Sequence, residues 1–173
     1  MNHNYIILFL VFFACLAVRT SYELLKKSGK ISEQNTPAFI TVLVAMILLW
    51  VSWFAMCPMD AFKIDLPAIA RMIGLALFVV GIGLAFTALA QLKGVEHIDH
   101  LVTTGLFSIT RHPMYVGFVF WIVGWAIYHG AALSLVPGMV CIGNIVFWAR
   151  LEDERLLVTY GERYKKYKEE TLF

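Results

Sequence analysis

Long apolar runs alternate with short polar segments along the chain. A helix needs about 20 mostly apolar residues to cross the hydrocarbon core of a bilayer. The longest run holds no Lys, Arg, Asp or Glu and exceeds one span, and His129-Gly130 near its middle indicates a turn between two helices. The apolar runs are Tyr5–Val18, Ala38–Cys57, Ala68–Leu92 and 113–149. They predict an all-α, polytopic membrane protein with about five transmembrane helices.

The segment from Arg150 onward differs from the rest because charged residues are frequent in it. Leu156, Tyr160, Tyr164 and Tyr167 recur there at spacings of four, four and three residues. Side chains at these spacings lie on one face of an amphipathic helix. We therefore expect a cytosolic C-terminal helix that either lies on the bilayer surface or covers a site at the inner ends of the transmembrane helices.

Composition agrees with lipid as the main solvent of this chain. Hydrophobic residues make up 60% of the sequence and charged residues only 15%, whereas soluble domains carry about 25% charged residues. No Lys or Arg precedes Tyr5–Val18, which favours a retained first helix over a cleaved signal peptide. We expect one membrane domain, with three N-terminal helices in 1–92 and a functional core in 93–173 that holds helices four and five and the C-terminal helix.

The distribution of basic residues predicts the orientation in the membrane. With five spans and the N-terminus outside, the inner segments are 19–36, 93–112 and 150–173. These segments hold all of the 14 Lys and Arg residues except Lys63 and Arg71. Because Lys and Arg mark the cytoplasmic side, we expect the C-terminus on the cytosolic side. The host membrane would be the plasma membrane in a prokaryote and the endoplasmic reticulum in a eukaryote.

Several kinds of partner are disfavoured by the residues present. Cys15, Cys57 and Cys141 lie far apart without a CxxC pair and are interpreted as small buried hydrophobic side chains. His97 and His100 have an HxxH spacing but no partner cysteine and no HExxH helix, so no metal is expected. The sequence shows no basic groove with interleaved aromatic residues, so a nucleic-acid partner is not expected. Membrane lipids remain the expected surroundings.

Two polar clusters, 100–117 and 150–154, lie at the predicted inner ends of the fourth and fifth helices. A tight turn pairs these helices antiparallel, so the clusters should be neighbours in space. Pro113 is well suited to start the fourth helix, because the first helical N–H has no partner within the helix. Gly117, one turn later, leaves room beside Tyr115 for a ligand or for a neighbouring helix.

The two clusters contain charged side chains of both signs, which we expect to lie close to one another. Arg111 forks toward carboxylates, and His112 can donate or accept near neutral pH. Glu152 and Asp153 supply acceptors for a cationic group. Together the four side chains can hold a zwitterion, with Arg111 or His112 on its carboxylate and the two acids on its ammonium.

A further pair, Arg150 and Glu154, is spaced four residues apart and shares one helix face. This pair can orient a polar headgroup at the membrane surface. An alternative interpretation needs no ligand: Arg111 and His112 would anchor the protein to lipid phosphates, and the acidic run would be solvated.

Three ordered blocks resemble a known family. The segment RHPMYVG at 111–117 matches the R-H-P-x-Y-x-G signature of the isoprenylcysteine carboxyl methyltransferase and phospholipid methyltransferase superfamily. HLVTTG at 100–105 resembles the H-x-L-V-x-x-G segment that precedes this signature, and EDERL at 152–156 with YGERYKKY at 160–167 resembles the family's C-terminal blocks. The resemblance covers about residues 97–168, and the first three helices add only length and hydrophobicity.

The resemblance implies an S-adenosylmethionine-dependent methyltransferase embedded in the membrane. Its cofactor pocket would form at the inner ends of the last two helices with the C-terminal segment. On the matching positions, the cofactor would be bound by His100, Gly105, Phe107, Arg111, His112, Pro113, Tyr115, Gly117, Glu152 and Asp153. Arg150 and Glu154 would face the acceptor as catalytic residues.

The expected acceptor is lipid-like or a small apolar molecule, with an isoprenylcysteine-type carboxylate favoured over a phospholipid amine or a small thiol. Two alternatives belong to other classes. A membrane NADPH-dependent lipid reductase has a similar C-terminal loop, but it typically has Asn where this chain has Met114 and Glu where it has Phe118. The other alternative is a non-enzymatic membrane protein, such as a small transporter or an assembly factor. The absence of Asp, Glu or Lys in the middle of the predicted spans argues against a transporter.

Overall fold

A computed structural model describes residues 3–32, 35–92 and 101–173 of the chain. Within these ranges the secondary structure is helical, and no strand is formed. The helices are α1 (His3–Lys27), α2 (Thr36–Met56), η1 (Cys57–Met59), α3 (Ala68–Leu92), η2 (Gly105–Ser108), α4 (Pro113–His129), α5 (Ala132–Tyr160) and α6 (Glu162–Glu170). The prediction of an all-α architecture is confirmed.

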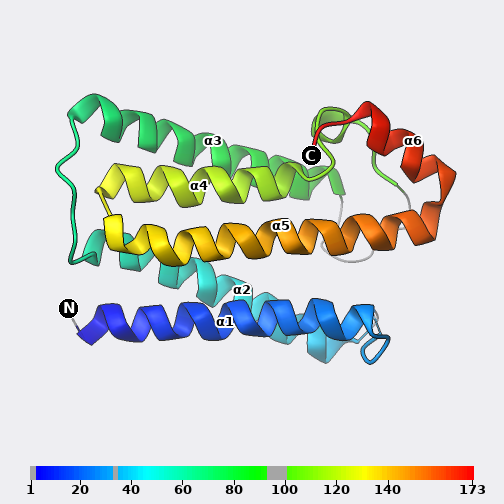
Figure 1. The fold of residues 1–173 in the computed structure, drawn as a ribbon, viewed down its shortest axis with the longest axis horizontal. Helices are drawn as coiled ribbons and strands as arrows, with labels where there is room; N and C mark the ends of the chain where they lie inside the picture. Colours follow the sequence, from blue (N-terminus) through cyan, green and yellow to red (C-terminus); the bar gives the residue numbers. More distant parts are fainter. Residues whose placement is uncertain (1–2, 33–34, 93–100) are drawn as a thin grey trace.

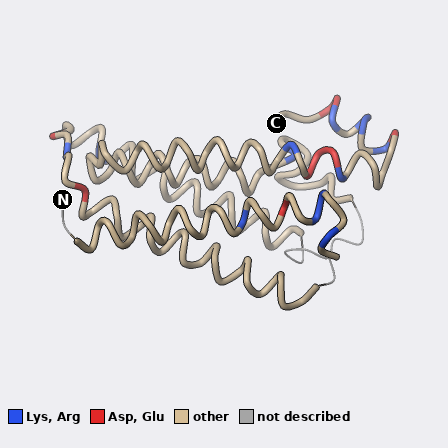
Figure 2. The backbone as a smooth tube through the Cα atoms, turned by 60° about the horizontal axis from the view of Figure 1, so that its bottom comes forward, with Lys and Arg blue, Asp and Glu red and all other residues tan. Residues whose placement is uncertain are grey.

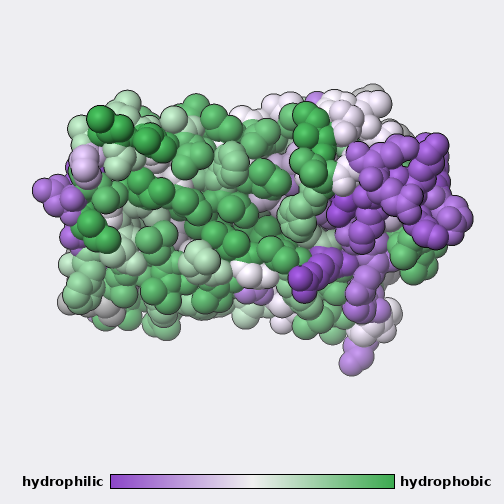
Figure 3. Space-filling view, turned by 45° about the horizontal axis from the view of Figure 1, so that its top comes forward, coloured by the Kyte–Doolittle hydropathy of each residue, from purple (hydrophilic) through white to green (hydrophobic). Residues whose placement is uncertain are grey.

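The five long helices run alongside one another, with α4 next to α3 and α1 next to α2 (Figure 1). Four of them, α1, α2 with η1, α3 and α5, are long and apolar enough to cross a membrane. The fifth, α4, is apolar but has 17 residues. Apolar side chains cover the body of the molecule in Figure 3, and hydrophilic side chains gather at one end. This distribution is that of an integral membrane protein.

Local sequence explains where several helices begin and end. The Asn35 side chain accepts a hydrogen bond from the Ala38 backbone N–H (3.0 Å), which caps the start of α2. Gly130 adopts φ +62° after the end of α4, a left-handed conformation that glycine tolerates. The Asp60 carboxylate accepts from the Ser134 backbone N–H (2.6 Å) in the first turn of α5. The turn predicted at His129-Gly130 is therefore present.

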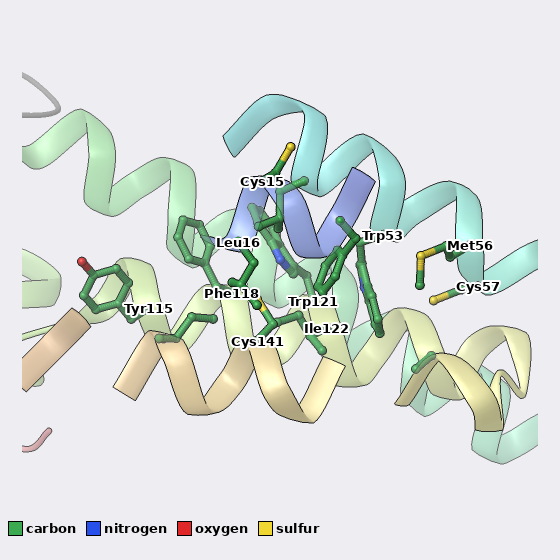
Figure 4. Packing of buried hydrophobic residues seen from close by; sticks show 14 of the residues in the cluster. Cys15, Leu16, Trp53, Met56, Cys57, Tyr115, Phe118, Trp121, Ile122 and Cys141 are labelled. Carbon is green, nitrogen blue, oxygen red and sulfur yellow. The ribbon is translucent and has the colours of Figure 1, made fainter. Parts of the chain in front are cut away.

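The core is rich in aromatic side chains contributed by four helices (Figure 4). Trp53 of α2 is fully buried and lies 5.8 Å, between ring centroids, from Phe12 of α1. Phe118 and Trp121 of α4 stack at 4.7 Å. Helices α3 and α4 approach so closely that a Cβ on Gly117 would lie 2.6 Å from the Gly81 carbonyl oxygen. These contacts hold α4 in a fixed position against its neighbours.

The C-terminal segment is broken at Gly161, which has φ +54° and separates α5 from α6. After this break α6 turns back toward the η2 region (Figure 1). Tyr164 and Tyr167 are buried against Leu101, and two further residues of the predicted apolar face, Leu156 and Tyr160, pack on the same cluster. The predicted face is therefore formed from two helices, and α6 covers the loop before α4.

Candidate active site

Most charged residues lie at one end of the helix bundle (Figure 2). We call this the charged end: it comprises the last turns of α1 from Arg19 to Lys27, the α4 start at Arg111-His112, the α5 segment 150–155 and α6. At the opposite end lie Asp60, Lys63, Asp65 and Arg71, in and around the α2–α3 connection. The two polar clusters picked out from the sequence both lie at the charged end.

Asp153 is the hub of the site. His112 Nε2 lies 2.8 Å from Asp153 Oδ1, a distance at which a ring N–H donates to the carboxylate. The Tyr164 hydroxyl donates to the same oxygen (2.5 Å), and Lys168 Nζ lies 3.2 Å from Oδ2. His112 lies at the start of α4, Tyr164 and Lys168 belong to α6, and Asp153 itself is on α5, so the carboxylate joins all three elements. His112 itself is only 4% exposed.

Arg111 fastens the segment after α6 to the start of α4. Its Nη1 donates to the backbone carbonyls of Lys168 (3.1 Å) and Thr171 (2.9 Å), and its backbone N–H donates to the Leu172 carbonyl (3.1 Å). Its Nε lies 3.7 Å from Asp153 Oδ1 and is buried without a hydrogen-bond partner. A buried donor without a partner is costly, so an acceptor that a ligand placed beside this nitrogen would be stabilising.

Two tyrosines of α6 act as buried hydroxyl donors. The Tyr167 hydroxyl donates to the Phe107 carbonyl (2.6 Å), and the Tyr164 hydroxyl donates to Asp153. Burial, opposed by the nearby Arg111 guanidinium, raises the pKa of Tyr167 to about 12. Burial and the hydrogen bond to the Asp153 carboxylate also raise the pKa of Tyr164. Both hydroxyls therefore stay protonated at neutral pH and keep α6 closed over the site.

Glu152 and Tyr115 form the boundary between this polar cluster and an apolar cavity. Glu152 Oε2 lies 3.8 Å from His112 Nδ1, and its side chain is 27% exposed. The Tyr115 ring stacks on the His112 ring with centroids 5.5 Å apart. On their other side, both residues line a cavity of about 380 Å³ that is enclosed by α1 to α5. The polar cluster and the cavity are therefore adjacent.

The cavity has a charged rim and an apolar interior. Aromatic and aliphatic side chains form most of its wall, among them Trp50, Phe86, Met114, Phe118 and Trp148. Its charged lining residues are Arg19, Glu23, Lys26, Glu152 and Arg155, all of which belong to the charged end. A pocket of this kind fits an amphiphile, because the apolar wall would bury a hydrocarbon chain and the rim would contact a polar head.

The wall of the cavity reaches the lipid-facing surface between α2 and α3. These helices hardly touch each other, whereas α1 packs closely on α2 and α3 on α4. Leu43 and Ile47 of α2 and Phe86 of α3 line the cavity and are also 41%, 55% and 63% exposed. A hydrocarbon chain can therefore reach the cavity from the bilayer without crossing the charged end.

Several residues of the expected cofactor set have structural contacts in this arrangement. Gly105 has φ +66°, and a Cβ there would meet the Gln91 side chain at 2.5 Å. Phe107 is buried with its carbonyl bound to Tyr167, and Pro113 is buried in the first turn of α4. Gly117 faces α3, so the room that this glycine leaves is filled by the neighbouring helix and not by a ligand. His100 lies outside the described residues.

The two residues expected to face the acceptor lie away from the cavity. Arg150 is exposed, and Glu154 is exposed and pairs with Lys27 of α1, with 2.6 Å between Glu154 Oε2 and Lys27 Nζ. Neither residue lines the cavity; Glu152 and Arg155 of the same helix do. The cause is helical phase: consecutive residues of α5 point about 100° apart, and the face toward the cavity carries Glu152 and Arg155.

Sequence reasoning also missed the contribution of α1. Arg19 and Glu23 line the cavity and form an ion pair with each other. Their signal in the sequence was an oppositely charged pair spaced four residues apart at the end of an apolar run. Such a pair is also common on solvated helix ends, so only the packing of α1 beside α5 reveals its place in the site.

Comparisons with known proteins identify a matching family and several relatives. Residues 69–163 match the sequence model of the phospholipid methyltransferase family. The protein-S-isoprenylcysteine O-methyltransferase of Dictyostelium discoideum is 30% identical over 158 residues, which is 86% of this chain and 65% of that protein. Protein-S-isoprenylcysteine O-methyltransferase B of Arabidopsis thaliana is 32% identical over 91 residues, which is 51% of this chain and 45% of that protein.

A second kind of relative matches over a shorter segment. The chloroplastic 15-cis-zeta-carotene isomerase of Zea mays is 35% identical over 72 residues, which is 42% of this chain and 20% of that protein. The chain thus spans between 20% and 65% of the length of these three relatives. No solved structure matches the chain.

Proposed function

Because the chain belongs to the phospholipid methyltransferase family, whose sequence model matches it from α3 to the start of α6, we propose that it is an S-adenosylmethionine-dependent methyltransferase of the membrane. Its acceptor would be lipid-like, with an isoprenylcysteine-type carboxylate favoured. The relatives named as protein-S-isoprenylcysteine O-methyltransferases support this choice of acceptor. A phospholipid amine and a small thiol are the alternative acceptors within the same reaction class.

One observation carries the proposal: Glu152 and Tyr115 belong both to the polar cluster around His112 and to the wall of the apolar cavity. A methyl donor held by the cluster and an acceptor held in the cavity would therefore meet at these two side chains. Group transfer gains most from such alignment, which is worth about 7–11 kcal/mol in well-oriented reactions. Methyl transfer would occur at the boundary between the polar cluster and the apolar cavity.

The residues of the cluster fit S-adenosylmethionine. When bound, it would supply an electrophilic methyl group on a sulfonium. The unpartnered Nε of Arg111 suits the carboxylate of the cofactor's amino-acid part. Glu152 suits its ammonium or sulfonium, and the Tyr115 ring beside it suits a cation. Asp153 would act indirectly, because its oxygens are already occupied by His112, Tyr164 and Lys168.

The chain's own residues would mainly orient the two reactants and exclude water. A carboxylate or thiolate acceptor is already nucleophilic and needs no base. An amine acceptor must lose a proton. Of the α5 glutamates at the charged end, Glu152 lines the cavity and Glu154 does not, and Glu23 of α1 lines it but is paired with Arg19. We therefore assign the base for an amine acceptor to Glu152 rather than to Glu154 or to His112, whose Nε2 is bound to Asp153.

Calorimetry with S-adenosylhomocysteine tests the cofactor site. The purified chain in detergent should bind this product, and Glu152→Gln should weaken binding by about tenfold, because a hydrogen bond to a charged group is lost. Glu154→Gln is the matched control: it removes the same charge two residues away, outside the cavity, and should leave affinity unchanged. Equal affinity of Glu152→Gln and the wild type would contradict the assigned site.

Two further measurements test the reaction class and the acceptor. In a thermal-shift comparison, stabilisation by NADPH instead of S-adenosylmethionine would favour a lipid reductase, and stabilisation by neither would favour a non-enzymatic membrane protein. Mass spectrometry after incubation with isotope-labelled cofactor, supplied with prenylcysteine, phospholipid amine and small-thiol acceptors in parallel, would identify the methylated class. Label on the prenylcysteine carboxylate is the expected result.

A further inference from the structure

The wall that α1 contributes to the cavity lies outside the part of the chain that the family's sequence model matches, residues 69–163. Its charged members are Arg19, Glu23 and Lys26. Arg19 and Glu23 are mostly buried, with side chains 15% and 13% exposed. A guanidinium and a carboxylate kept this close to an apolar cavity are expensive to desolvate. The ion pair between them offsets part of this cost, and both side chains still line the cavity.

Arg19 is held in a fixed orientation from two sides. Its Nη1 pairs with Glu23, and its guanidinium lies 5.1 Å from the ring centroid of Trp148 on α5. The Trp148 ring is itself fixed, because its Nε1–H donates to the Thr20 hydroxyl (3.2 Å), which donates to the Asn144 side-chain oxygen (2.9 Å). A fixed guanidinium loses little side-chain entropy when it binds a ligand. Pairing with Glu23 engages Nη1 out of a group that carries five N–H donors.

The charged rim of the cavity has an excess of positive charge. Arg19, Lys26 and Arg155 are cationic, and Glu23 and Glu152 are anionic. Glu152 lies at the boundary between the cavity and the His112 cluster, with its Oε2 3.8 Å from His112 Nδ1, and Glu23 is paired with Arg19. An anion arriving from the cavity side would thus meet Arg19 as a buried, oriented cation, whereas a cationic head would meet a rim of the same sign.

We propose that Arg19 is the headgroup-binding residue of the cavity, and that it selects amphiphiles with an anionic head, a carboxylate or a phosphate, over neutral and cationic ones. The apolar chain would lie against the Trp50 and Phe86 side of the cavity. That this amphiphile is the methyl acceptor rests on the proposed function. The preference for an anionic head rests on Arg19 alone and can be measured without any methyl transfer.

Equilibrium binding of radiolabelled hexadecyl probes to the purified chain in a neutral detergent tests the proposal. The probes share one chain and differ in the head: hexadecanoate, hexadecyl phosphate, hexadecanol and hexadecylamine. The wild type should bind one of the two anions about tenfold more tightly than hexadecanol, as expected for a charge-assisted hydrogen bond. The order of the two anions identifies the head as carboxylate or phosphate. Equal binding of all four probes would overturn the proposal before any variant is made.

Variants locate the preference. Arg19→Gln should remove the preference for an anion and leave hexadecanol affinity unchanged, and Arg19→Lys should retain part of it because the charge remains. Lys27→Gln is the matched control, since Lys27 lies about two turns further along α1 and pairs with Glu154 outside the cavity. This variant should bind all four probes like the wild type. Loss of anion and alcohol binding together in Arg19→Gln, or a preference that survives it, would show that Arg19 has only a structural role.

Binding of S-adenosylhomocysteine, measured on the same samples, separates this proposal from the proposed function. If the wild type prefers the anionic probe but does not bind S-adenosylhomocysteine, the headgroup site is supported and the proposed methyltransferase function is contradicted. If the wild type binds S-adenosylhomocysteine but shows no preference for an anionic probe, the proposed methyltransferase function is supported and the headgroup site is contradicted. Arg19→Gln should keep full S-adenosylhomocysteine affinity, which also shows that the variant is folded.

Discussion

At the scale of single residues, the site depends on one carboxylate that joins three elements. Asp153 Oδ1 receives the His112 ring and the Tyr164 hydroxyl, and its Oδ2 lies near Lys168. Its side chain is 15% exposed, so these hydrogen bonds are only weakly screened by solvent. Removing the carboxylate would leave the buried His112 and Tyr164 groups without their partner.

Asp153→Ala should therefore destabilise the protein and weaken cofactor binding together. Removing one member of a buried charged network costs about 3 kcal/mol, which corresponds to a fall of about 6–12 °C in the thermal midpoint of a chain of this size. Thermal unfolding of the detergent-solubilised protein measures this fall. Glu154→Ala, which breaks only the exposed pair with Lys27, should change the midpoint by no more than about 2 °C. Equal shifts for the two variants would contradict the role of Asp153.

The residues of the site divide into those that sequence could predict and those that needed the fold. Arg111, His112, Glu152 and Asp153 could be placed together because a tight turn makes α4 and α5 antiparallel. Which residues of α5 line the cavity could not be derived from the sequence, because Arg150 with Glu154 and Glu152 with Arg155 both satisfy the three- or four-residue spacing of a helix face. Helical phase is decided by packing against α1 and α4, which periodicity alone does not show.

At the scale of helices, the α3–α4 pair is held by backbone contact through glycines. A Cβ on Gly124 would lie 2.5 Å from the Phe78 backbone nitrogen and 2.6 Å from the Gly74 carbonyl oxygen. Backbone atoms in two packed helices cannot move aside as a flexible side chain can. Small residues at such positions let helices associate closely in lipid, where no hydrophobic driving force acts between them.

Gly124→Ala should therefore separate α3 from α4 and destabilise the protein by about 1–3 kcal/mol through overpacking. Gly83→Ala is the matched control on α3, because a Cβ there has no neighbour within 4 Å; helix propensity should make it neutral or slightly stabilising, by up to about 1 kcal/mol. Thermal midpoints in the same detergent compare the two variants. A stability loss in Gly83→Ala as large as that in Gly124→Ala would rule out close packing as the cause.

The bounds of the helices show which local signals suffice. The third apolar run was expected over Ala68–Leu92, and α3 covers this range in the described part of the chain, with Pro67 directly before its first residue. The first apolar run is Tyr5–Val18, and α1 continues past it to Lys27, with the Arg19–Glu23 ion pair in its charged part. The break at Gly161 was not predicted, since the apolar spacing from Leu156 to Tyr167 continues across it; only the positive φ at Gly161 reveals the turn.

At the scale of the whole molecule, the asymmetry of charge links the site to the membrane. The body of the bundle is apolar in Figure 3 and the polar side chains gather at the charged end. Helices α1 and α2 are connected at this end, near Ser28, and α2 and α3 are connected at the other, near Ala61 (Figure 1). If basic residues mark the cytoplasmic side, the site opens to the cytosol, where a soluble cofactor is present.

Cysteine labelling in intact bacterial cells that express the protein in their inner membrane tests this orientation. Ala61→Cys should react with a membrane-impermeant maleimide added from outside, and Ser28→Cys should react only after the membrane is permeabilised, because the two exposed positions lie at opposite ends of α2. The native background should be low, since Cys15, Cys57 and Cys141 are all buried. The reverse pattern would place the charged end outside, away from cytosolic cofactor. Labelling of both positions from one side would mean that α2 does not cross the bilayer.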